Sequence, residues 1–256
     1  MTLPHFLTDA PLAPDEEGRL ALSLTRELAE HLRSARIRPG EHIVLADGQG
    51  KGLEIEVEAV FGERLEGRVV RRLIDRVGEQ LTLVQGISRS DRMDQIVRQA
   101  TELGLVRIIP FKAERTTVRL DEAQRNAKQE RWKRVARAAT EQSTRLTAPL
   151  IDAPVDLAGA LALTDDFDGR ILAWEEAGDT AMPLGLLVRG MATAVFANPR
   201  IALFIGPEGG FAPAELVQMR EAGVQLASLG PTILRTETAA LVAAAIVLYH
   251  LGGLGA

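Results

Sequence analysis

The chain has 256 residues, and 46% of them are hydrophobic, which is ordinary for a globular protein with a buried core. It contains no cysteine, which excludes disulfides, thiolate nucleophiles and cysteine-ligated zinc or iron–sulfur sites, and its four scattered histidines do not predict a metal site. The net charge is −5, but residues 73–150 carry 15 Lys and Arg against 10 Asp and Glu, an excess that suits a polyanionic partner.

Residues 1–72 are predicted to form a small β-rich domain. Apolar and acidic side chains alternate from Leu53 to Ala59, a pattern that is typical of a half-buried strand, and a turn sequence at 47–50 precedes them. The polar composition of residues 71–76 predicts a linker. Strands are expected at 41–46, 53–59 and 65–70, and a short helix is expected within 22–32.

Residues 73–256 alternate between strand and helix patterns, which predicts an α/β domain. The strands are continuous apolar runs, as in a sheet buried on both faces. Asp91 is the expected N-cap of one helix and Gly104 its C-terminal glycine, with Met93, Ile96 and Val97 on the buried face. Strands are expected at 81–87, 105–110, 171–174, 201–205 and 224–229, and further helices at 123–142, 213–221 and 237–251.

The longest apolar run, residues 239–249, is too short to cross a bilayer, and the first residues do not have the pattern of a signal sequence. A cytoplasmic protein without membrane association is therefore expected. The helix at 123–142 carries a dense set of basic residues, which are either a solvated face paired with Glu130 and Glu141 or contacts for a polyanion.

Two loops near the C-terminus each follow a predicted strand and lead into a predicted helix. Ligands of open α/β sheets bind at the carboxyl ends of strands, and glycine lets the backbone approach them. No Lys-Ser/Thr follows the glycines and no Gly-x-Gly-x-x-Gly is present, which excludes a triphosphate loop and a Rossmann oxidoreductase. Each loop alone also fits a tight turn without a ligand. Thr236 is the expected N-cap of the last helix. The loops comprise Ile205, Gly206, Pro207, Glu208, Gly209, Gly210 and Phe211, and then Leu229, Gly230, Pro231, Thr232, Ile233, Leu234, Arg235, Thr236, Glu237, Thr238 and Ala239.

With these loops, the sequence resembles the RsmE family of 16S ribosomal RNA (uracil-N3)-methyltransferases, in the SPOUT superfamily of knotted methyltransferases. The resemblance covers nearly the whole chain. It departs from the family pattern at Glu30, where a histidine is usual, and at Gln99, where a lysine is frequent. Beside the two loops, the matching residues are 3–6, 36–40, 47–48, 92–93, 100–104, 114–115, 131–132, 139–143, 145, 149 and 175–176.

The resemblance implies a PUA-like β-barrel domain over residues 1–72 and a SPOUT methyltransferase domain with a trefoil knot over residues 73–256. It further implies a homodimer that binds S-adenosylmethionine without a metal and acts on 16S rRNA of the small ribosomal subunit. The expected cofactor contacts are Ile205, Gly206, Glu208, Gly209, Gly210, Leu229, Gly230, Leu234, Arg235, Thr236 and Ala239. The expected RNA contacts are Arg36, Arg38, Arg92, Arg115, Arg131 and Arg134.

Methylation of uracil at N3 requires loss of the imide proton, and therefore a base or a cation that stabilises the resulting anion. The absence of cysteine excludes methylation at pyrimidine C5 through a cysteine adduct. We predict Arg145 as the cation and Glu237 or Glu208 as the base or orienting group. Two alternatives stay open, namely a 2′-O-ribose methyltransferase of the same superfamily and a non-catalytic RNA-binding or ribosome assembly factor.

Overall fold

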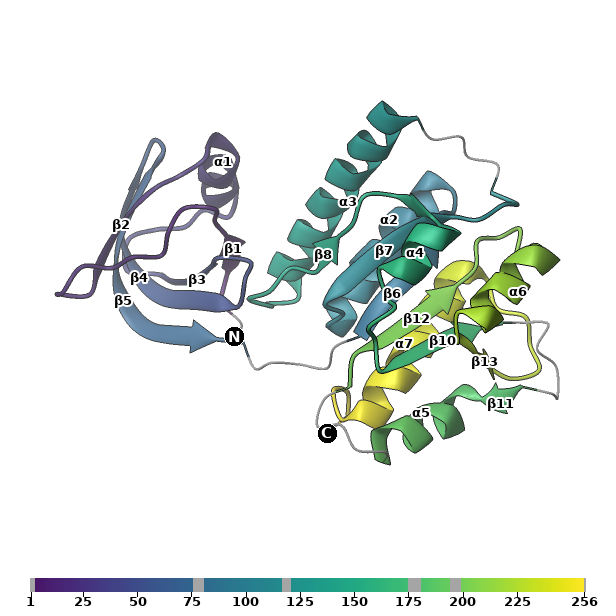
Figure 1. The fold of residues 1–256 in the computed structure, drawn as a ribbon. Helices are drawn as coiled ribbons and strands as arrows, with labels where there is room; N and C mark the ends of the chain where they lie inside the picture. The colour runs from purple at the N-terminus through teal and green to yellow at the C-terminus, as the bar shows by residue number, and fades with distance from the viewer. Residues whose placement is uncertain (1–2, 76–80, 117–120, 175–180, 194–198, 256) are drawn as a thin grey trace. The chain divides into compact units, whose positions relative to one another are not determined.

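The computed structural model describes residues 3–75, 81–116, 121–174, 181–193 and 199–255 (Figure 1). The chain forms two compact units. The first comprises Met1–Val77 and Arg137–Ala148, and the second comprises Gly78–Ala136 and Pro149–Ala256. Helix α3 (Glu122–Gln142) therefore contributes its last turns to the first unit. Glu175 and Glu176, which contribute to the family resemblance, lie outside the described residues.

The first unit is built on a five-stranded sheet with the order β1-β3-β4-β5-β2. Its pairings are antiparallel except for that of β1 with β3. The predicted alternation in β4 is confirmed, since Leu53, Ile55 and Val57 are buried in the core beneath this sheet. The elements are β1 (His5–Leu7), β2 (Arg19–Ser23), α1 (Arg26–Ser34), β3 (His42–Ala46), β4 (Lys51–Phe61) and β5 (Arg64–Ile74).

The structure corrects two predictions for this unit, the bounds of one helix and the linker. The helix expected within residues 22–32 begins only at Arg26, because residues 19–23 pair with β5 as strand β2, and Thr25 caps the helix through its side chain. The predicted linker at 71–76 is strand up to Ile74, because Arg71 pairs with Glu54 and Leu73 with Gly52. Arg76 lies outside the described residues.

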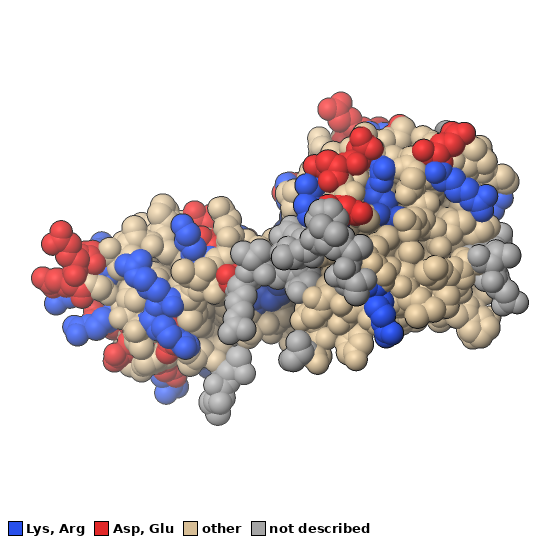
Figure 2. All heavy atoms as spheres, turned by 60° about the horizontal axis from the view of Figure 1, so that its bottom comes forward, with Lys and Arg blue, Asp and Glu red and all other residues tan. Residues whose placement is uncertain are grey.

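Charged side chains of both signs are mixed on the visible face of the first unit (Figure 2). Three arginines of β5 pair with acidic residues of the same sheet. Arg64 lies 3.0 Å from Glu66, and Arg71 lies 3.0 Å from Glu54. Such exposed pairs contribute little to stability. They do reduce the net positive charge that this part of the surface offers to a polyanion.

The second unit is built on an eight-stranded sheet with the order β11-β13-β10-β12-β6-β7-β8, and β9 pairs beside β8 with β7. Every described pairing in it is parallel. Strands β6 and β12 are buried along their whole length, as expected for a sheet covered on both faces. The strands are β6 (Leu81–Gly86), β7 (Arg107–Lys112), β8 (Leu150–Ile151), β9 (Val155–Asp156), β10 (Gly169–Ala173), β11 (Met182–Pro183), β12 (Ile201–Ile205) and β13 (Gln225–Ser228).

Helices cover both faces of this sheet (Figure 1). One apolar core contains Met93, Trp132, Val188 and Ala243, and it packs α2, α3, α5 and α7 on one face. The opposite core contains Leu157 and Met219, and it packs α4 and α6 on the other. The remaining helices are α2 (Ser90–Leu103), α4 (Leu157–Ala162), α5 (Leu184–Thr193), α6 (Pro213–Glu221) and α7 (Thr236–Leu251).

The predicted helices of the second unit are confirmed, with two corrections at their starts. Gly104 ends α2 with a φ of 101°, but Arg89 is its N-cap and Asp91 lies within the first turn. Arg235 is the N-cap of α7, because the hydroxyl of Thr236 donates to the carbonyl of Gly206 instead of capping the helix. Over the residues that the structure describes, no helix is long and apolar enough to cross a membrane.

Candidate active site

The two glycine loops meet at one edge of the parallel sheet. Strands β10, β12 and β6 are neighbours, so their carboxyl ends lie together, and β13 ends beside β10. A cavity of about 310 Å³ opens at this edge. It is lined by Arg92, Ala173, Ile205, Gly206, Pro207, Glu208, Ile233, Leu234, Arg235, Thr236 and Ala239.

A second cavity of about 30 Å³ shares Ala173, Leu234 and Ala239 with the first. Its other lining residues are Trp174, Leu229, Gly230 and Thr232. The structure therefore brings both loops to one site. Of the residues predicted to contact a cofactor, all line one of these cavities except Gly209 and Gly210.

Close packing explains the glycines of the first loop. A Cβ atom on Gly206 would lie 2.8 Å from the ring of Phe211, and one on Gly86 would lie 2.5 Å from Pro207. A Cβ atom on Gly209 would lie 3.2 Å from the carbonyl oxygen of Arg115. Larger residues would displace the loop. Gly209 therefore shapes the loop at its contact with residue 115 rather than forming the cavity wall.

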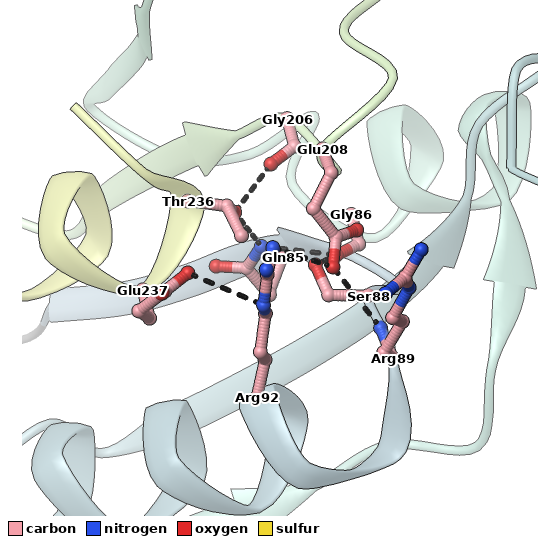
Figure 3. Close-up of polar contacts among 9 residues, drawn as sticks. All are labelled: Gln85, Gly86, Ser88, Arg89, Arg92, Gly206, Glu208, Thr236 and Glu237. Carbon is pink, nitrogen blue, oxygen red and sulfur yellow. Dashed lines mark hydrogen bonds and ion pairs between the residues drawn. The ribbon is translucent and has the colours of Figure 1, made fainter. Parts of the chain in front are cut away.

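A chain of hydrogen bonds joins three segments at this edge (Figure 3). Gln85 Nε2, at the end of β6, donates to Thr236 Oγ1 over 3.0 Å, and Thr236 Oγ1 donates to the carbonyl of Gly206 over 2.6 Å. Gln85 is fully buried, and its Oε1 accepts no hydrogen bond from the described residues. The sequence analysis missed Gln85. Its signal was a polar side chain inside the apolar run 81–87.

Arg92, from the first turn of α2, lies between two carboxylates (Figure 3). Its Nη1 donates to Glu208 Oε1 over 3.0 Å, and its Nε lies 4.0 Å from Glu237 Oε2. The backbone N–H of Arg89 also donates to Glu208 Oε1, over 3.3 Å. Glu208 thus ties the first glycine loop to the start of α2. Arg92, predicted as an RNA contact, lines the same cavity as the predicted cofactor residues.

The other predicted RNA contacts are exposed and lie apart from the cavity lining. Arg36 and Arg38 precede β3 in the first unit, and Arg36 has a φ of 57°. Arg131 and Arg134 lie on α3, where Arg131 Nε bonds Asp94 Oδ2 over 3.0 Å. Arg115 follows β7, with its backbone against Gly209.

Arg145, the predicted cation, belongs to the first unit, whereas the residues that line the cavity belong to the second. Burial lowers the pKa of the Arg145 guanidinium, and the charge of Asp75 opposes this shift. Burial also lowers the pKa of His5, against a hydrogen bond with the backbone of Arg145 and the charge of Asp75. The structure thus groups Arg145 with His5 and Asp75, two neighbours that the sequence analysis did not assign to it.

A family model described as an RNA methyltransferase domain matches residues 76–248 of the chain. The ribosomal RNA small subunit methyltransferase E of Mycobacterium bovis is 36% identical over 211 residues, which cover 81% of this chain and 78% of the relative. The protein of the same name from Bacillus subtilis is 29% identical over 234 residues, which cover 89% of this chain and 90% of the relative.

Two solved structures are similar to the fold as a whole. A ribosomal RNA small subunit methyltransferase E from Neisseria gonorrhoeae, bound to S-adenosyl methionine, has a TM-score of 0.78 and 30% identity. The match covers 95% of this chain and 96% of that one. The putative methyltransferase of Legionella pneumophila, in complex with the same cofactor, has a TM-score of 0.80 and 25% identity, over 97% of this chain and 98% of that one. On this evidence the chain belongs to the RsmE family of ribosomal RNA small subunit methyltransferases, in the SPOUT superfamily.

Proposed function

We propose that this protein transfers a methyl group from S-adenosylmethionine to N3 of a uridine in 16S rRNA of the small ribosomal subunit. One observation carries the proposal. Both glycine loops line a joined pair of cavities at the carboxyl ends of parallel strands, in a chain similar over nearly its full length to a methyltransferase bound to S-adenosyl methionine. The relatives' names supply the substrate class.

The chemistry of the two cavities fits the cofactor. The smaller one has apolar walls from Ala173, Trp174, Leu229 and Leu234, which suit contact with an edge of the flat adenine ring rather than enclosure of the whole ring. Gly230 has a φ of 115° and no atom within 4 Å of the position that a Cβ would take, so the chain is open on that side, while its N–H donates to the hydroxyl of Ser228. Glu208 lines the larger cavity, where its carboxylate also pairs with Arg92. When bound, the cofactor supplies an electrophilic methyl group.

The residues of the chain have to orient the uracil and remove its N3 proton. We propose Glu237 or Glu208 as the proton acceptor, since Glu208 lines the larger cavity and Glu237 follows its lining residue Thr236. Arg145 is proposed as a cation that stabilises the negative charge of the target base. Arg145 is partly buried, and the charge of Asp75 acts on its guanidinium.

We propose residues 1–72 as a PUA-like domain that contacts RNA through Arg36 and Arg38, and residues 73–256 as a SPOUT domain with a trefoil knot. The five-stranded sheet and the exposure of both arginines support the first assignment. The crossed chain order of β12, β10 and β13 and the contact of Thr236 with Gly206 support the second. Arg115, Arg131 and Arg134 would extend the RNA contacts. The active form would be a cytoplasmic homodimer.

The test uses small ribosomal subunits from cells that lack this protein. Incubation with the purified protein and S-adenosylmethionine should place one methyl group on the N3 of a 16S uridine, located by mass spectrometry of nuclease digests. A methyl group on a ribose 2′-oxygen would contradict the proposed position. No transfer, together with no heat of S-adenosylmethionine binding in calorimetry, would instead indicate a non-catalytic RNA-binding protein.

A further inference from the structure

The position of Arg92 is fixed from three sides. Met93, next in the chain, is fully buried in the core of the second unit and anchors the first turn of α2. Glu208 accepts a hydrogen bond from Nη1, and Glu237 lies 4.0 Å from Nε. The side chain is only 28% exposed. A guanidinium held in this way does not have the freedom of an exposed contact to the RNA backbone, and it belongs to the cavity wall.

Arg92 keeps donor groups for a ligand. A guanidinium carries five N–H groups in a planar fork, and the contacts with Glu208 and Glu237 involve only Nη1 and Nε. No hydrogen bond joins Nη2 to the part of the chain that the structure describes. Because the fork is planar, it can donate hydrogen bonds to two coplanar oxygen atoms of a ligand. It can also donate to one oxygen atom and to the edge of the ring that carries this oxygen.

The two carboxylates beside Arg92 differ in their hydrogen bonds. Glu208 Oε1 accepts from Arg92 and from the backbone of Arg89, so that it holds the glycine loop and the guanidinium in place. Glu237 is 13% exposed, and its Oε2 is enclosed without a hydrogen-bond donor among the described residues. Buried acceptor oxygens without a donor are rare in proteins and indicate a missing partner.

A second acceptor without a donor lies close to the first. Gln85 Nε2 bonds the hydroxyl of Thr236, the residue before Glu237, and Oε1 of the same amide has no partner in the described part of the chain. The end of β6 and the start of α7 thus hold two enclosed acceptor oxygens next to Thr236, which lines the cavity. Arg235, which also lines the cavity, is the other cation at this end of α7. The arrangement calls for a ligand with an N–H group next to carbonyl oxygens.

An imide has this pattern, with one N–H between two carbonyl groups. We propose that Arg92 and Glu237 are the catalytic pair for the target uracil, an inference that rests on the proposed function. Glu237 accepts the N3 proton, and Arg92 stabilises the negative charge that spreads to a neighbouring carbonyl oxygen. Glu208 is a positioning residue that holds Arg92. In this arrangement Arg92 is a catalytic group rather than a contact to the RNA backbone.

The step balances in atoms and charge. The N3–H bond breaks, and the proton moves to a carboxylate oxygen of Glu237. The N3 electron pair forms the new bond to the methyl carbon, and the electrons of the broken carbon–sulfur bond stay on sulfur, which becomes a neutral thioether. The products are N3-methyluridine and S-adenosylhomocysteine. Glu237 then releases its proton to water when the products leave.

The test measures single-turnover methyl transfer to unmodified small subunits between pH 6.5 and 9.5, with calorimetric affinity for S-adenosylmethionine as a separate readout. Arg92→Lys should lower the rate at pH 7 by about 10²–10³-fold, and Glu237→Gln by about 10²–10⁴-fold. For both variants, the affinity for S-adenosylmethionine should stay within about threefold of the wild-type affinity. A change of 1.4 kcal/mol would alter it about tenfold. Arg98→Lys and Glu102→Gln, which change exposed residues of α2, are matched controls and should behave as wild type.

The pH profile separates a catalytic from a structural role. The deficit of Arg92→Lys should shrink as the pH rises, because the imide then ionises with less help. It should also shrink on subunits that contain 5-fluorouridine, whose N3–H is more acidic. A deficit that stays constant across pH and with both substrates would overturn the proposal. If Arg92→Lys does not fold, as judged by its melting temperature, Arg92→Gln is measured in its place.

Two further results are decisive. A tenfold loss of S-adenosylmethionine affinity in Arg92→Lys, with an unchanged rate at saturating cofactor, would assign the guanidinium to the cofactor carboxylate and overturn the proposal. If the wild-type protein itself transfers no methyl group to N3 of these subunits, the proposed function fails instead. A wild-type protein that methylates N3, with variants that match its rate at every pH, would contradict only the inference about Arg92 and Glu237.

Discussion

At the scale of single residues, Thr236 has two roles at the start of α7. Its hydroxyl accepts a hydrogen bond from Gln85 and donates one to the carbonyl of Gly206, and the residue is buried. Because these partners belong to β6 and to the loop after β12, one side chain connects three segments that are distant in sequence. Thr236 therefore contributes to the site by connecting these segments rather than by capping the helix.

Thr236→Val should destabilise the protein, because a methyl group replaces the hydroxyl and leaves a buried donor on Gln85 and a buried acceptor on Gly206 unpaired. The expected loss is about 1–3 kcal/mol in the free energy of unfolding, measured by urea denaturation. Thr236→Ser keeps the hydroxyl and is the control. Equal stability of the Val variant and the wild type would mean that the hydrogen-bond chain does not hold the loops together.

Arg145→Ala should reduce methyl transfer to small subunits by about 10²–10³-fold, the usual cost of losing one stabilising charge at a reaction centre. Affinity for S-adenosylmethionine should stay unchanged, because the cavity lining belongs to the other unit. Arg98→Ala, at an exposed position of α2, is a control for general loss of charge. Transfer at the wild-type rate by the Arg145 variant would remove Arg145 from the reaction.

At the scale of elements, the loop between β12 and α6 is shaped by packing against its neighbours. Phe211 stacks on Phe111 with ring centroids 6.1 Å apart and also lies against Gly206. Glu215 of α6 is buried, and its carboxylate accepts hydrogen bonds from the backbone N–H groups of Ala212 and Glu114. The loop is therefore held in shape before any ligand binds, which lowers the entropic cost of binding.

Gly206→Ala tests this rigidity. The new methyl group would lie 2.8 Å from the ring of Phe211, so the ring or the loop has to move where the cavity is lined. The expected result is at least a tenfold loss of S-adenosylmethionine affinity in calorimetry, equivalent to about 1.4 kcal/mol. Gly190→Ala, in α5 with open space around its Cβ position, is the control and should bind normally.

The elements of the first unit enclose His5, which is 9% exposed and whose Nε2 has no hydrogen-bond partner among the residues that the structure describes. Because burial lowers the pKa of His5 in the folded state, the unfolded chain binds the proton more readily than the folded one. Stability should therefore fall as the pH decreases below about 6.5. Denaturant unfolding between pH 7.5 and 5.5 should show a steeper loss for the wild type than for His5→Gln. Parallel curves would show that His5 does not contribute to this dependence.

At the scale of the whole molecule, positive charge is partly neutralised by ion pairs in both units. The protein is acidic overall, and many arginines of both units pair with carboxylates, such as Arg131 with Asp94 and Arg137 with Asp9. Binding to a ribosomal subunit would therefore depend on a limited set of exposed cations, among them Arg36 and Arg38. Long-range attraction by net charge is not available to this chain.

Affinity for small ribosomal subunits should decrease with salt, and each lost phosphate contact should reduce the slope of log affinity against log salt by about 0.7–0.9. The double variant Arg36→Gln and Arg38→Gln should thus lower this slope by up to about twice that amount. Filter binding from about 50 to 300 mM salt measures it. An unchanged slope would exclude both arginines as phosphate contacts.

The sequence by itself determined the class of the second unit and the loops that line its candidate site. Apolar runs such as 201–205 and helical periodicity such as Met93, Ile96 and Val97 are local signals, and burial on both faces of a sheet produces them directly. Both glycine loops were also visible, because a backbone that approaches its neighbours closely needs glycine at Gly206 whatever its partner is.

Only the tertiary structure decided which side chains share the site. Gln85 and Arg92 lie more than a hundred residues from their partners Thr236 and Glu208, and no local pattern encodes such contacts. The same holds for residues 71–74. Their polar side chains predict a linker, but their backbone groups form hydrogen bonds with β4, and the segment is a strand. Periodicity reports on burial along one element, whereas the assignment of a charge to a cavity depends on where distant elements meet.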